Sequence, residues 1–195
     1  MLISTLILGW FGVFLFLIIV FSFRKLAANN EFAALHLIMA VMYAMWLPLP
    51  IALYQLLDSE LLLTGTIFGL TYLLMLIITM TLQVGHISYI TKHHVDQKQG
   101  EYMMETLSNP YEMLVNVIKS IWALFLAITF WKNDELFMAV MMTLFSLLLF
   151  YYLLLILQTS ITKQIKLLSK VKPNPFLINI ETLLFFILLM SYISF

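Results

Sequence analysis

Three polar residues at helical spacing are the clearest candidates for chemistry in this sequence. Glu112, Asn116 and Lys119 stand four and then three residues apart, so on a helix they share one face. They occupy an otherwise apolar stretch, and Glu181 lies at a comparable depth in another. An ionisable group costs at least ~2.5 kcal/mol near the centre of a bilayer and less near its surface, so these residues are candidates for a functional site.

Two interpretations of Lys119 and Glu181 are open. In the first, the two side chains anchor the fold, either by pairing with each other or by reaching the lipid headgroups. In the second, they line a pocket that faces the cytoplasm. The second interpretation predicts that Lys119→Met harms activity more than folding.

A second polar face runs along residues 61–90. Six of its polar residues fall within a sector of about 120° on a helix, so we expect this side to face protein rather than lipid. They are Thr64, Thr71, Tyr72, Thr79, Gln83 and His86. Gly65 and Gly69 adjoin this face as a GxxxG pair, which indicates a close helix crossing, although glycine is also common in membrane helices generally.

The histidines offer a further site. His36 and His86 are expected at similar depths on neighbouring helices, where two imidazoles can hold a haem or a metal ion. No HExxH motif or other carboxylate at ligand spacing accompanies them, and the chain has no cysteine. We therefore expect hydrogen-bonded histidines, with no metal and no cofactor.

Motifs of soluble enzymes are missing from the sequence. It contains no GxSxG, GxxxxGK[ST] or GxGxxG and no paired intramembrane carboxylates. It also lacks a basic patch with interleaved aromatic residues, so nucleic acid is not an expected partner. A lipid-active enzyme built from dispersed histidine and glutamate side chains remains an alternative.

Composition decides which elements must position these residues. With 63% hydrophobic and 10% charged residues and a mean hydropathy of +1.02, the chain has too little polar surface for a water-soluble globule. We predict an all-α, polytopic membrane protein with a single domain over 1–195. Its six spans are expected at 2–23, 32–57, 61–90, 111–131, 136–158 and 176–195.

Prolines and charges refine this topology. Pro48 and Pro50 predict a kink or break in the second span, which should pack against protein. Residues 95–110 read as a polar connecting loop, and 161–171 as a basic amphipathic helix on an anionic leaflet.

The lysines and arginines are distributed very unevenly between the two sides. The loops after spans one, three and five hold eight of them, whereas those after spans two and four hold only Lys132. By the positive-inside rule, both termini lie outside and the long loops lie in the cytoplasm. The candidate site residues then fall in the cytoplasmic half of the membrane.

Three functions are compatible with this pattern. The leading one is a non-catalytic subunit or partner-binding component of a membrane assembly, whose partner is another membrane protein or a second copy. The alternative is a small transporter or channel for an ion, metabolite or lipid, with a polar vestibule that faces the cytoplasm. A lipid-active enzyme is third. The expected location is the cell membrane, with a bacterial plasma membrane preferred.

Overall fold

The computed structural model describes residues 1–93, 97–161 and 168–195, and these are helical apart from short turns. The elements are α1 (Leu2–Ala28), α2 (Phe32–Trp46), α3 (Leu49–Leu57), α4 (Glu60–His93), α5 (Gln97–Lys132), α6 (Leu136–Ser160), the 3-10 helix η1 (Leu168–Lys170) and α7 (Pro175–Ser194). Six stretches are long and apolar enough to cross a membrane, with α2 and α3 together forming one of them. The predicted all-α fold with six membrane spans is confirmed.

The second span is broken where the prolines predict. Helix α2 ends at Trp46 and α3 begins at Leu49, because Pro48 and Pro50 have no N–H to donate to the preceding turn. The Pro48 carbonyl accepts a hydrogen bond from the Ala52 N–H at 3.0 Å, so the helix resumes at once. Trp46 and Leu49 are fully buried, which places the break against protein.

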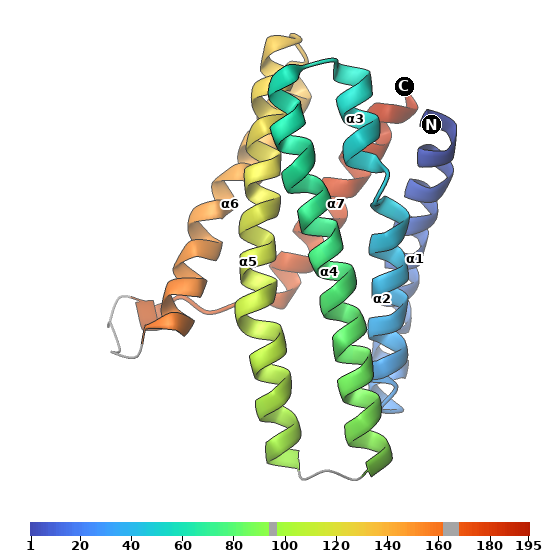
Figure 1. Ribbon diagram of the computed structural model, residues 1–195, viewed down its shortest axis with the longest axis vertical. Helices are drawn as coiled ribbons and strands as arrows, with labels where there is room; N and C mark the ends of the chain where they lie inside the picture. The colour runs from blue at the N-terminus through green and yellow to red at the C-terminus, as the bar shows by residue number, and fades with distance from the viewer. Residues whose placement is uncertain (94–96, 162–167) are drawn as a thin grey trace.

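The prediction of a loop over 95–110 is wrong for residues 97–110. Helix α5 continues through Pro110 to Gln97, and with α4 it extends past the other helices as an antiparallel pair (Figure 1). Gly100 packs against Ile90, where an added Cβ would come within 3.0 Å of its side chain. This pairing stabilises a polar helical segment that hydropathy alone reads as a loop.

Helix α7 lies differently from the rest. The first five spans (α1, α2 with α3, α4, α5 and α6) follow one another as antiparallel neighbours, whereas α7 crosses them diagonally, from α6 to the N-terminal end of α1 (Figure 1). Both chain termini lie at the same end of the bundle (Figure 1), as an even number of spans requires. The positive-inside rule assigns this end to the outside, and we call the other end cytoplasmic.

Large rings fill the space between α7 and the helices that it crosses. We call Trp46, Tyr72, Trp122, Phe185 and Phe186 the aromatic layer. Trp46 stacks on Phe186 with centroids 3.7 Å apart and planes inclined by 8°, and Trp122 meets Phe185 edge-on at 5.2 Å. All five are buried, so side chains separate α7 from α2, α4 and α5, whereas α7 packs directly on α1.

The predicted amphipathic helix at 161–171 falls largely on residues 162–167, which lie outside the described residues. Of the remainder, Leu168–Lys170 form η1. The chain then enters α7 at Asn174, whose side-chain oxygen accepts from the N–H groups of Phe176 and Leu177 at 3.1 and 3.2 Å. This is an ordinary N-cap, and it fixes where the last span begins.

Two glycines let α4 approach α5 closely. A Cβ on Gly65 would lie 2.6 Å from the Phe125 Cβ, and one on Gly69 would lie 2.7 Å from the Trp122 ring. We expect Gly65→Ala and Gly69→Ala each to destabilise the protein by about 1–3 kcal/mol, because the added methyl group forces the helices apart. Thermal unfolding in detergent, followed by tryptophan fluorescence, measures the loss.

Gly85 on the same helix is the matched control, since a Cβ there would meet nothing within 4 Å. Gly85→Ala should leave stability unchanged or raise it slightly, because alanine favours helix. Equal melting temperatures for all three variants would show that the crossing tolerates a methyl group.

Candidate functional site

Lys119 of α5 and Glu181 of α7 form a buried ion pair in the interior of the bundle. Lys119 Nζ donates to Glu181 Oε2, and to Thr182 Oγ1 at 3.0 Å. The Tyr152 hydroxyl on α6 donates to the same carboxylate oxygen at 3.3 Å. Lys119 is 1% exposed and Glu181 5%, so the pair is buried within the bundle.

Two aromatic rings surround the lysine charge. Nζ lies 5.7 Å from the centroid of Tyr72 and 5.9 Å from that of Tyr152, which are cation–π distances. Lys119 is nine residues from Pro110 and thirteen from Lys132, about 14 Å and about 20 Å along the helix axis. The lysine therefore does not reach the headgroups, and of the sequence interpretations the internal pair is the one that forms.

A second polar contact lies nearer the cytoplasmic end. Gln83 Nε2 of α4 donates to Glu112 Oε1 of α5 at 3.1 Å. Gln83 is 1% exposed and its Oε1 has no hydrogen-bond partner, whereas Glu112 is partly exposed. Tyr43 and His36 of α2 lie within electrostatic range of Glu112. This contact combines a buried amide with a partly exposed carboxylate.

Asn116 lies on the same face of α5 but plays a local part. Its Nδ2 donates to the Glu112 backbone carbonyl at 2.8 Å. The backbone carbonyl of Asn116 accepts from the Ser120 hydroxyl at 2.9 Å. Thr79 likewise donates to the Met75 carbonyl of its own helix at 2.8 Å. Both side chains are buried, yet these bonds do not link helices.

The predicted polar face of α4 is buried over most of its length. Tyr72, Thr79, Gln83 and His86 are buried and Thr71 is partly buried. Thr64 is exposed, so the prediction is wrong there. At this end α4 turns a different face, with Leu62, Gly65 and Thr66, toward its neighbours, and it packs against α3 as well as α2.

The two histidines engage different partners. His86 Nε2 lies 3.4 Å from the Gly100 carbonyl on α5, while His36 Nδ1 lies 2.7 Å from the Phe32 carbonyl of its own helix. Within 1–93, 97–161 and 168–195, no three histidine, aspartate or glutamate side chains are grouped closely enough to hold a metal ion.

Sequence reasoning missed two side chains that complete the deep pair, Tyr152 and Thr182. Thr182 directly follows Glu181, which was an available signal. Tyr152 is one of nine tyrosines in an aromatic chain, so nothing in the linear sequence distinguishes it. Comparison with protein-family models, with curated proteins and with solved structures found no match for this chain.

The buried pair predicts a strong loss of stability when one partner is removed. Lys119→Met and Glu181→Met should each cost about 3–5 kcal/mol, because each leaves a charge without its partner inside the bundle. The double variant should recover most of that loss, since it buries no unpaired charge. Thermal unfolding of the four proteins in detergent closes the double-mutant cycle.

Lys98→Met is the control, because Lys98 is exposed on the same helix. Loss of activity without loss of stability in Lys119→Met would favour a pocket role for the lysine over a structural one.

Proposed function

We propose that this protein is a small membrane transporter whose substrate site opens to the cytoplasm beside Glu112 and Gln83. One observation carries the proposal. A partly exposed carboxylate within a membrane span is hydrogen-bonded to a fully buried glutamine whose second polar atom is unused. Ionisable groups placed in this way in membranes mark substrate and ion pathways.

The distribution of polarity along the bundle supports this proposal. The Glu112–Gln83 contact lies in the cytoplasmic half, and the sealed Lys119–Glu181 pair lies deeper. Beyond it, the aromatic layer packs α7 against α2, α4 and α5. A transporter that faces the cytoplasm has this asymmetry, with polar groups on the open side and tight packing on the closed side.

The break between α2 and α3 supplies the moving part. It lies beside the aromatic layer, and Trp46 at its edge stacks on Phe186 of α7. Hinges are short segments at the ends of elements that absorb changes in backbone angle. Rotation of α3 about Leu47 and Pro48 would loosen the outer half without disturbing the Lys119–Glu181 pair.

The absence of cysteine makes thiol labelling a direct test. In native membranes, Glu112→Cys should react with a membrane-impermeant maleimide added from the cytoplasmic side, because this position is partly exposed at the cytoplasmic end of its span. Thr129→Cys, at a position buried in the outer half of α5, should react slowly from the outside as the closed side opens. Lys98→Cys and Asn133→Cys, at exposed positions, report complete labelling from inside and outside respectively.

A Thr129→Cys variant that stays inert from outside, while Asn133→Cys reacts fully, would contradict transport. Labelling of Asn133→Cys from the cytoplasmic side only would instead reverse the assigned orientation.

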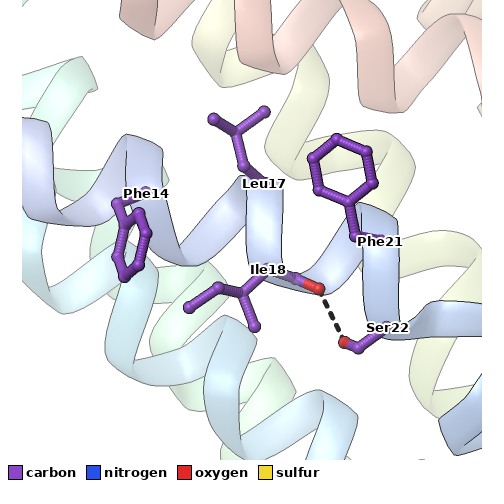
Figure 2. Close-up of a pocket in the computed structure, with 5 residues that line it drawn as sticks. All are labelled: Phe14, Leu17, Ile18, Phe21 and Ser22. Carbon is purple, nitrogen blue, oxygen red and sulfur yellow. Dashed lines mark hydrogen bonds between the residues drawn. The ribbon is translucent and has the colours of Figure 1, made fainter.

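A second function is a non-catalytic subunit of a membrane assembly, and helix α1 favours it. Only 22% of the most apolar stretch of α1 is buried, against 67% for the span in α5. The surface of α1 that points away from the bundle has a shallow hollow of about 430 Å³. It is lined by Phe14, Leu17, Ile18, Phe21 and Ser22 (Figure 2). The Ser22 hydroxyl donates to the Ile18 carbonyl at 2.6 Å (Figure 2), so the surface offered to a partner is apolar.

The subunit function predicts that the protein leaves the native membrane, in mild detergent, with a stoichiometric membrane protein partner. Phe14→Ala with Phe21→Ala should reduce the recovered partner at least several-fold, because both rings are exposed on α1. Native mass spectrometry of the intact complex measures the stoichiometry, and Phe150→Ala on the exposed face of α6 is the control. Recovery of the protein alone would count against a stable subunit.

A further inference from the structure

We propose that Glu112 and Gln83 form a proton-binding site, in which Glu112 takes up a proton from the cytoplasm and donates it in a hydrogen bond to Gln83. The inference deepens the proposed transporter function, because it names the proton as the coupling ion. Its starting point is the buried amide oxygen of Gln83, which has no partner although the same amide donates to Glu112.

The chemistry of the two groups explains the unused oxygen. An ionised carboxylate only accepts hydrogen bonds, so it satisfies the Gln83 N–H but offers nothing to Gln83 Oε1. A protonated carboxyl and a primary amide instead form two parallel bonds, N–H to carboxyl oxygen and O–H to amide oxygen. The first of these is present, at 3.1 Å between Gln83 Nε2 and Glu112 Oε1.

One proton completes the pair. It binds a lone pair of Glu112 Oε2, the new O–H points at Gln83 Oε1, and the carboxyl charge changes from −1 to zero. A hydronium ion from the cytoplasmic water delivers the proton and leaves as water, so charge and atoms balance. The last torsion of a glutamate is broad, so the carboxyl group can turn toward the amide at low cost.

The surroundings of Glu112 make it a better proton acceptor than Glu181, the buried carboxylate described above. Glu181 on α7 is ion-paired with Lys119, while no lysine or arginine pairs with Glu112 among the described residues. The titratable groups that face Glu112 from α2 are His36 and Tyr43. On α4, His86 is directed to the Gly100 carbonyl instead.

Access and ligand number also favour a proton. Glu112 follows Pro110 by two residues at the cytoplasmic end of its span and is partly exposed, which places it to exchange a proton with water at the membrane surface. The site offers one carboxylate and one free amide oxygen. Calcium takes six to eight oxygen ligands and magnesium six, counting waters, whereas a proton needs only a donor oxygen and one acceptor.

Infrared difference spectroscopy of the full-length protein in liposomes tests the site. Lowering the pH should produce the C=O stretching band of a protonated carboxylic acid. The band should be lost in Glu112→Gln and kept in Glu105→Gln, whose position on α5 is exposed. In Gln83→Leu the band should move to higher frequency, because the carboxyl O–H loses its amide acceptor. Wild-type protein grown with ¹³C-labelled glutamate should show the same band shifted down, which identifies it as glutamate even if a variant fails to fold.

Three outcomes would overturn the inference. In the first, the C=O band persists in Glu112→Gln. In the second, it is lost in Glu181→Gln instead. In the third, its frequency is the same in Gln83→Leu as in the wild type. The result is distinguishable from a failure of the transporter proposal, since thiol labelling of Thr129→Cys reports opening of the outer half whether or not Glu112 binds a proton.

Discussion

The ion pair between Lys119 and Glu181 holds the one helix that does not run alongside its neighbours. Helix α7 crosses the bundle on a layer of rings, and apolar contacts alone do little to fix its position, because lipid tails are as apolar as the side chains that they replace. A charge pair with exact partners is different, since moving α7 by one turn would leave both charges unsatisfied inside the bundle. Tyr152 adds α6 to the same contact, and Thr182 gives the lysine a second acceptor on α7.

Two polar contacts at two depths differ in how complete they are. In the deep one, Lys119 has two acceptors and Glu181 Oε2 has two donors, and both side chains are buried. The shallow one leaves an amide oxygen of Gln83 unused beside a partly exposed carboxylate. A complete contact suits a fixed element of the fold, whereas an incomplete one suits a site that gains a partner during function.

The outer half of the bundle is built from shape rather than polarity. Glycines at Gly65 and Gly69 let α4 approach Phe125 and Trp122, and stacked rings fill the space beneath α7. Helix α3, which follows the break in the second span, lies in this half. Close packing beside a helix break permits an opening there that leaves the polar cytoplasmic half intact, which is the physical basis of the proposed transport cycle.

The sequence by itself determined the six spans, the break at Pro48 and Pro50, and the placement of the polar residues toward one side, because hydropathy, proline geometry and loop charge are local properties. Only the tertiary structure decided which polar groups meet. Lys119 and Glu181 are 62 residues apart in the chain, and Gln83 and Glu112 are 29 apart, so their contacts depend on how helices cross. Crossing geometry also decided that Thr64 faces outward and that 97–110 is helical, since α4 supplies a partner for that polar segment. The unused oxygen of Gln83 likewise exists only once the two helices are placed side by side.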